Sequence, residues 1–281
     1  MKPTEPGAGG VAQAGQDRPG RHRVGPDGRL QPAGLAALPG GDGVDSLFTR
    51  SAADYAAGHA GQQVALLLAG AATAGGAVDL ARLRAAGCDL VVSLIDTDDD
   101  TVRAAVAAAA GQLTATLGDL RTVPLAPRSV DIAVCCLLLE RIRNAELVLD
   151  RIVDAVKPGG LLLLAVTDRD SAAGLLDRKL PAWARALAWR RLRPGQPGPY
   201  PAVYEQLASG RGIQAYTLRR GLVIAQRQDR AALAGQRGRA PLWLLAARRL
   251  AAVASRPALS PGRDELRFVI RKPEDRFARV L

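Results

Sequence analysis

The regular alternation of short apolar runs with amphipathic segments is the feature that most constrains how this chain folds. Apolar runs with the length of buried strands occur at 64–69, 90–95, 113–117, 130–137 and 161–166. Segments with helical character separate them at 79–86, 100–110 and 144–156. Strands that alternate with helices imply right-handed crossovers and a parallel sheet. Together with later runs at 222–226 and 266–270, the pattern predicts an α/β fold with a mainly parallel seven-stranded sheet and helices on both faces.

The two flanks of this pattern differ from its centre. Residues 1–43 are rich in Gly, Pro, Arg and Gln and have little apolar periodicity, which predicts a disordered or loosely attached arm. The folded domain is then expected over 44–281, beginning with a short helix at 44–59. Further helical segments are predicted at 175–192 and 242–254, the first of them within a helical insertion after the fifth strand.

That insertion, 170–215, concentrates much of the aromatic content of the chain. It includes Trp183, Trp189, Tyr200 and Tyr204. Its place after the fifth strand of a parallel sheet suits a cap over a substrate pocket. Ordinary core packing of an amphipathic segment explains the same aromatic residues equally well, and both interpretations stay open.

The net charge of +11 and the isoelectric point near 10.5 come almost entirely from arginine at the two ends of the chain. Such a charge is compatible with a nucleic-acid partner. It is also what an Arg-, Ala- and Gly-rich composition produces, and the central block carries many aspartates instead. A nucleic-acid partner is therefore not favoured.

Cysteine content and hydropathy indicate the compartment. Cys88, Cys135 and Cys136 form neither a disulfide framework nor a zinc-binding pattern, so buried free thiols and no metal site are expected. The chain has no apolar stretch of about 18 residues or more, so no membrane association is expected either. We expect a cytoplasmic protein.

Two aspartates mark the ends of neighbouring predicted strands. Asp96 ends the second strand and Asp119 follows the third. Ligands of open α/β sheets bind at the carboxyl ends of the strands. A carboxylate at Asp96 can accept the ribose hydroxyls of a nucleoside, and Asp119 can accept the exocyclic amine of adenine. The alternative for Asp96 is a cap of the helix that follows it.

Two further stretches carry a resemblance to a known family. Gly118-Asp119-Leu120, then Val123-Pro124-Leu125 and Ser129-Val130-Asp131, resemble the adenine site and fourth strand of class I S-adenosylmethionine-dependent methyltransferases. Val156-Lys157-Pro158-Gly159-Gly160 resembles the turn before their fifth strand. The resemblance covers about 60–170 and is to the type 11, small-molecule branch. It implies a Rossmann-like methyltransferase fold with S-adenosylmethionine as cofactor.

The glycine-rich loop departs from the family pattern. The best fit is Leu68-Ala69-Gly70-Ala71-Ala72-Thr73-Ala74, in which Leu68 occupies the usual acidic position and Gly70 alone of the glycines is retained. The resemblance implies cofactor contacts from Ala69, Gly70, Ala72, Asp96, Asp119 and Leu120. A side chain at Ala72 stands where backbone must approach the ligand closely.

Candidate catalytic residues are few. Glu140 lies just past the fourth strand, and His59 precedes the first. Glu140 can equally form a salt bridge with Arg141 or Arg143, and His59 can be an ordinary helix-end residue. The leading hypothesis is methyl transfer from S-adenosylmethionine to a small-molecule substrate. The alternatives are a pseudo-methyltransferase that serves as a scaffold or binding module, and an RNA methyltransferase.

Overall fold

The computed structural model describes residues 47–70, 77–98, 100–108, 114–192, 201–230 and 264–274. The predicted arm at 1–43 and the predicted helix at 242–254 lie outside these residues. So do Ala72 and most of the glycine-rich loop, Tyr200, and the side chain of Trp189.

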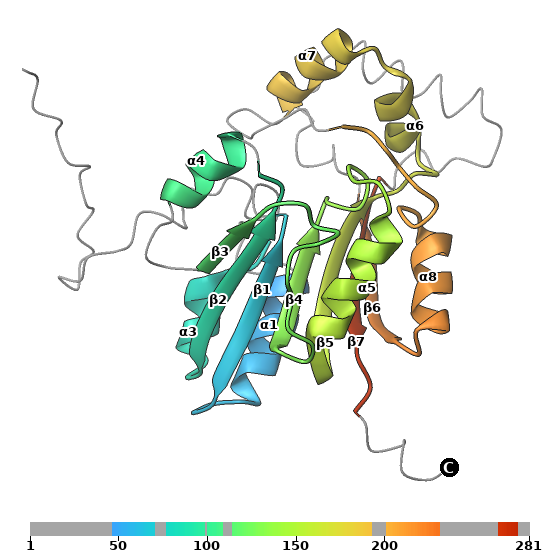
Figure 1. The fold of residues 1–281 in the computed structure, drawn as a ribbon. Coiled ribbons are helices and arrows are strands. Elements are labelled where there is room, and N and C mark those ends of the chain that lie inside the picture. Colours follow the sequence, from blue (N-terminus) through green and yellow to red (C-terminus); the bar gives the residue numbers. More distant parts are fainter. Residues whose placement is uncertain are drawn as a thin grey trace, which may run out of the picture. The chain divides into compact units, whose positions relative to one another are not determined.

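The described strands form one seven-stranded sheet in the order β3-β2-β1-β4-β5-β7-β6 (Figure 1). Strands β1 to β5 run parallel, β7 is antiparallel to both of its neighbours, and the predicted mainly parallel sheet is confirmed. The strands span β1 Gln63–Ala69, β2 Asp89–Asp96, β3 Thr114–Leu117, β4 Val130–Cys136, β5 Val156–Thr167, β6 Val223–Arg230 and β7 Glu265–Arg271.

Two apolar clusters cover the two faces of the sheet. Because side chains alternate along a strand, Leu66 and Leu68 of β1 enter one cluster and Leu67 enters the other. The first cluster contains buried residues of α1 (Leu47–Ala57) and α3 (Leu80–Ala85). The second contains those of α5 (Ala145–Ala155) and α8 (Gly210–Arg219). In Figure 1, α5 lies in front of the sheet and α1 behind it, so helices cover both faces as predicted.

The insertion after β5 holds two helices where the sequence predicted one. These are α6 (Ala172–Lys179) and α7 (Ala182–Leu192). Leu180 between them is extended because it precedes Pro181, and a residue before proline is driven out of the helical region. Ser171 caps the start of α6 by accepting a hydrogen bond from the Gly174 N–H at 3.1 Å. Helix α4 (Asp100–Ala108) follows β2.

Helix α8 has no counterpart in the prediction. Its first turn contains Gly210 and Gly212, residues that favour loops. Ser209 nevertheless accepts a hydrogen bond from the Gly212 N–H at 3.0 Å and caps the helix. Ile213 and Tyr216 then pack fully buried in the second cluster, and this packing outweighs the poor helix propensity of the glycines.

Asp131 ties three neighbouring elements together at the amino edge of the sheet. Its Oδ2 accepts hydrogen bonds from the Ala65 N–H on β1 and from Nζ of Lys157 on β5, both at 2.8 Å. The hydroxyl of Tyr55 on α1 lies 3.4 Å from Oδ1, and burial together with this carboxylate raises the pKa of Tyr55 to about 12. The aspartate that opens the fourth strand is therefore a structural residue.

Asp131→Ala is expected to lower the free energy of unfolding by about 2 kcal/mol, because it leaves the partly buried donors of Ala65, Tyr55 and Lys157 without their carboxylate. Urea denaturation measures the change. Asp54→Ala, on the exposed side of α1, is the matched control and should stay within about 0.5 kcal/mol of the wild type. Equal stability of both variants would contradict this role.

Candidate functional site

The carboxyl ends of β1, β2 and β3 meet at one edge of the sheet. The Gly70 N–H donates to the Ile95 carbonyl at 2.9 Å, and the Gly118 N–H donates to the Asp96 carbonyl at 3.0 Å. These bonds extend the strand pairing past the ends of β1 and β3. The structure therefore brings Gly70, Asp96 and Asp119 to the same edge, where ligands of open α/β sheets bind.

Asp96 is buried at this edge and forms an ion pair. Its Oδ1 accepts hydrogen bonds from the Thr97 N–H at 2.8 Å and from Nη2 of Arg141 at 2.9 Å. The side chain of Asp96 is 0% exposed and that of Arg141 is 4% exposed. Helix α4 begins only at Asp100, so these contacts do not make Asp96 its cap. The carboxylate expected to face an open crevice is covered by a guanidinium.

Sequence reasoning missed this role of Arg141. It considered Arg141 as a partner of its neighbour Glu140, whereas the structure pairs Arg141 with Asp96, 45 positions away. The available signal was an arginine inside the apolar run that follows the fourth strand, because arginine is almost never fully buried unless it is paired. Sequence spacing alone did not identify the partner.

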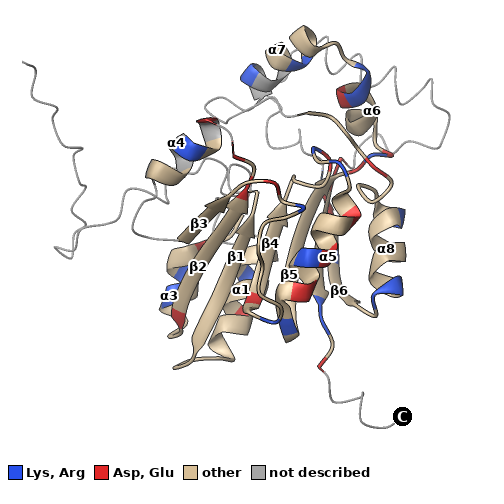
Figure 2. Ribbon diagram, viewed as in Figure 1, with Lys and Arg blue, Asp and Glu red and all other residues tan. Residues whose placement is uncertain are grey.

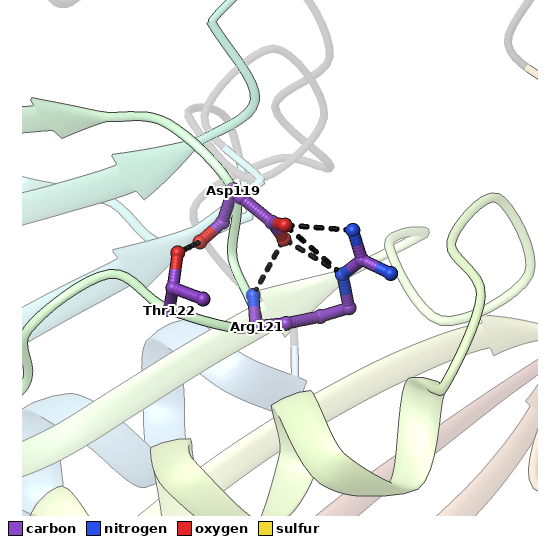
Figure 3. Close-up of polar contacts among 3 residues, drawn as sticks. All are labelled: Asp119, Arg121 and Thr122. Atoms are coloured by element: carbon purple, nitrogen blue, oxygen red, sulfur yellow. Dashed lines mark hydrogen bonds and ion pairs between the residues drawn. The ribbon is translucent and has the colours of Figure 1, made fainter.

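Asp119 is tied to Arg121 at the end of β3 (Figure 3). Oδ1 accepts from the backbone N–H and from Nε of Arg121, each at 2.9 Å, and Oδ2 lies 2.7 Å from Nη2. Hydrogen bonding to Arg121 lowers the pKa of Asp119 to about 2. With 43% of its side chain exposed, Asp119 is an ionised acceptor that is partly open to solvent.

The described part of the glycine-rich loop is apolar. Ala69 is fully buried at the end of β1, and Gly70 adopts φ +79°, a conformation that glycine allows. Leu68 packs in the first cluster between Leu94 and Val134 of the neighbouring strands. Leu120 is likewise buried, in the second cluster, so its side chain belongs to the core.

Glu140 lies between the ends of β4 and β5. Its Oε1 accepts a hydrogen bond from the Thr167 N–H at 3.1 Å. Its Oε2 is buried and has no hydrogen-bond partner among the described residues. Burial raises the pKa of Glu140 above its ordinary range, because the charged form loses its water. The carboxylate thus has a higher proton affinity than a surface glutamate.

The segment that follows the insertion is anchored around Glu140. The N–H groups of Val203 and Tyr204 donate to the Glu140 carbonyl at 2.9 and 3.0 Å. The Tyr204 hydroxyl donates to Asp177 of α6 at 3.0 Å. Glu205 accepts hydrogen bonds from the N–H groups of Asn144 and Ala145 at the start of α5, at 2.8 and 3.0 Å. We call residues 203–205 the anchoring segment.

His59 lies at the opposite edge of the sheet. It follows α1, its ring stacks on Tyr55 with centroids 4.3 Å apart, and its Nδ1 lies 2.8 Å from the Tyr55 carbonyl. Tyr55 in turn contacts Asp131 at the start of β4. The structure brings Glu140, Asp96 and Asp119 to the carboxyl edge but does not bring His59 to it.

The central part of the chain matches a family of known function. Residues 68–164 match the family model of a methyltransferase domain. A search of curated proteins found no match to the sequence. None of the described helices combines the length and apolar character needed to cross a membrane. Among the described residues, no group of three or more His, Cys, Asp or Glu is arranged to hold a metal ion.

Solved structures similar to this chain include three methyltransferases. One, from Mesorhizobium loti, is S-adenosylmethionine-dependent; it is 17% identical, with 75% of this chain and 91% of that chain covered and a TM-score of 0.46. Phosphoethanolamine N-methyltransferase 2 of Haemonchus contortus, in complex with S-adenosyl-L-methionine, is 18% identical. The match covers 87% of this chain and 58% of that chain, with a TM-score of 0.49. The 1,6-didemethyltoxoflavin-N1-methyltransferase of Burkholderia thailandensis, with bound S-adenosylhomocysteine, is 15% identical. The match covers 82% of this chain and 80% of that chain, with a TM-score of 0.44.

The family assignment rests on the matched family model together with the quoted motifs. Residues 68–164 match the family model of methyltransferase domains and resemble the class I S-adenosylmethionine-dependent members. The cofactor of that family is S-adenosylmethionine.

Arg141→Met is expected to lower the free energy of unfolding by about 3 kcal/mol, because it leaves the buried Asp96 carboxylate without its cation. Thermal and urea denaturation measure the loss. The matched control is Arg143→Met, which removes the same charge from an exposed position two residues away and should change stability by less than about 0.5 kcal/mol. An Arg141 variant as stable as the control would show that the ion pair does not contribute.

Proposed function

We propose that this chain transfers a methyl group from S-adenosylmethionine to a small-molecule acceptor. The observation that carries the proposal is the pair of carboxylates at the carboxyl ends of β2 and β3, within a domain of the methyltransferase family. Asp96 stands where it can receive the ribose hydroxyls, and Asp119 where it can receive the adenine amine. Gly70 and Ala69 would lie beside the methionyl part, with Ala72 and the backbone of Leu120 as further proposed contacts.

The described residues at this edge lie where contacts to such a cofactor are expected. Asp119 is ionised and partly exposed, and Gly70 leaves the strand end with no side chain in the way. Asp96 fits by its place in the fold, although in this structure its Oδ1 holds the guanidinium of Arg141. When bound, the cofactor supplies a methyl group on a positively charged sulfur, open to attack by a nucleophile.

Glu140 is our candidate for the catalytic base. Methyl transfer from the bound cofactor would join its methyl carbon to an acceptor oxygen or nitrogen as the carbon–sulfur bond breaks. The acceptor would have to lose its proton, and the buried Oε2 of Glu140 could receive it. The raised pKa of Glu140 suits this task, since a base of higher proton affinity accepts a proton more readily near neutral pH. His59 has no part in this scheme, because it lies at the other edge of the sheet.

The insertion is the proposed substrate cap. Helices α6 and α7 follow β5 directly, and the anchoring segment joins α6 to the loop that carries Glu140. Trp183 of α7 is 73% exposed, so ordinary core packing does not account for it. We further place the reaction in the cytoplasm, because Cys88, Cys135 and Cys136 are buried free thiols.

A scaffold function without catalysis is favoured by one observation. Leu68, at the usual acidic position, is packed in the core and offers no carboxylate to the ammonium group of a cofactor. An RNA substrate has no comparable support. In Figure 2 the basic residues of the described chain are spread over α3, α4, α5, α7 and α8, and acidic residues lie on α4 and α5 as well.

Calorimetric titration with S-adenosylhomocysteine tests cofactor binding directly. Asp119→Asn is expected to weaken binding about tenfold, because the adenine amine loses a charged acceptor. Asp100→Asn, which changes an exposed carboxylate on α4, is the control and should bind like the wild type. If the wild type gives no heat at millimolar ligand, the methyltransferase proposal fails and the scaffold function remains.

Glu140→Gln is expected to change the pH dependence of stability. A carboxyl group whose pKa is raised in the folded state binds its proton more tightly when folded, so its protonated form stabilises the fold. The wild type should therefore lose stability relative to the Gln variant as pH rises through and above the ordinary carboxyl range. Urea denaturation between about pH 4 and pH 7 measures this difference.

The same variant tests catalysis. Formation of S-adenosylhomocysteine in the presence of a panel of phenols, amines and thiols should fall by about a hundredfold or more in Glu140→Gln. The rise of kcat/KM with pH that the base imposes should disappear with it. Unchanged turnover with an unchanged pH profile would exclude Glu140 as the base.

A further inference from the structure

The ion pair between Arg141 and Asp96 crosses the centre of the proposed cofactor site. Asp96 ends β2, Arg141 follows β4, and β1 lies between these two strands in the sheet. A contact of 2.9 Å between Nη2 of Arg141 and Oδ1 of Asp96 therefore passes over the carboxyl end of β1. That end is Leu68-Ala69-Gly70, the start of the glycine-rich loop and the switch point where the strand order reverses.

A nucleoside and Arg141 use the same acceptor. Ribose hydroxyls bind a strand-end carboxylate as hydrogen-bond donors, and the guanidinium of Arg141 is already a donor to that carboxylate. Both groups are buried, so the attraction between their charges is stronger than it would be in water. With Arg141 in place the side chain of Asp96 is 0% exposed, so a ribose reaches this carboxylate only when the guanidinium moves.

We propose that Arg141 is an internal competitor for the ribose-binding carboxylate and thereby sets the affinity of the site for nucleosides. The proposal rests on the function proposed above. The conformation with Arg141 on Asp96 excludes the ribose, and a nucleoside binds only the conformation in which Arg141 has turned away. The apparent dissociation constant is then the intrinsic one divided by the fraction of molecules in the open conformation.

The charged groups around Arg141 favour the closed conformation without fixing it. Asp96 makes the ion pair, and the Glu140 carboxylate lies close enough to act on the same region electrostatically. Arg141 lies in the connection between β4 and α5, and the open conformation requires a change in its side-chain torsions. A ligand that binds Asp96 must offset the loss of this contact.

The test compares Arg141→Met with the wild type by calorimetric titration against two probes. Adenosine carries the 2′- and 3′-hydroxyls of the ribose, whereas 2′,3′-dideoxyadenosine lacks both. Arg141→Met should tighten adenosine binding by about tenfold or more, since the carboxylate is released to the ligand. The affinity for 2′,3′-dideoxyadenosine should remain unchanged, because that probe does not use Asp96. Arg143→Met is the matched control and should bind both probes like the wild type.

Arg141→Gln is a second variant for the case that Arg141→Met does not fold. Glutamine is neutral but can still donate a hydrogen bond to Asp96, so the variant should be more stable and should tighten adenosine binding to a smaller extent. Equal adenosine affinity in the wild type and in whichever Arg141 variant folds would overturn the proposal. Equal tightening for both probes would also overturn it, because the gain would then not involve the ribose hydroxyls.

S-adenosylhomocysteine, titrated alongside, separates this proposal from the function on which it rests. If the wild type and the Arg141 variants bind it equally well, cofactor binding stands and the competitor role of Arg141 falls. If adenosine binding tightens in the Arg141 variants while S-adenosylhomocysteine binds to none of the proteins, the competitor role stands and the methyltransferase function falls. If no protein binds any of the three probes, both proposals fall.

Discussion

The hydrogen bonding of β1 on both sides by parallel strands is the constraint on which the rest of the structure depends. β1 pairs with β2 along its whole length and with β4 over residues 66–69. Because all three strands run in the same direction, their carboxyl ends reach one edge together. Asp96, Gly70 and the loop that carries Glu140 and Arg141 are therefore brought together there, close enough for Arg141 to pair with Asp96. The apolar residues of β1 thus determine where the chemistry can occur.

Much of the fold could be predicted because its signals are local. Apolar runs with turn residues between them identified each strand within a few residues, and alternation with helices gave their direction. Helix α8 was not predicted because its glycines favour a loop, and only burial of Ile213 and Tyr216 against the sheet makes it stable. The break between α6 and α7 was likewise missed, although Pro181 marks it.

The site was less predictable, because its contacts join residues far apart in the chain. The positions of Asp96 and Asp119 after their strands were read correctly from the sequence. Their arginine partners differ in sequence separation. Arg121 lies two residues from Asp119, whereas Arg141 reaches Asp96 across the end of another strand. Leu68 could be recognised as a departure from the family pattern, but its tight packing between Leu94 and Val134 appears only in the sheet.

The anchoring segment attaches the chain that follows the insertion to the rest of the domain. Val203, Tyr204 and Glu205 fasten the chain to the Glu140 carbonyl, to α6 and to the start of α5. A change in length or composition of the chain between α7 and this segment leaves those attachments in place. The insertion can therefore differ in length or sequence while the Glu140 carbonyl keeps these hydrogen bonds. Under the proposed function, the segment that would select the acceptor and the residue that would take its proton are separate, so each could change without the other.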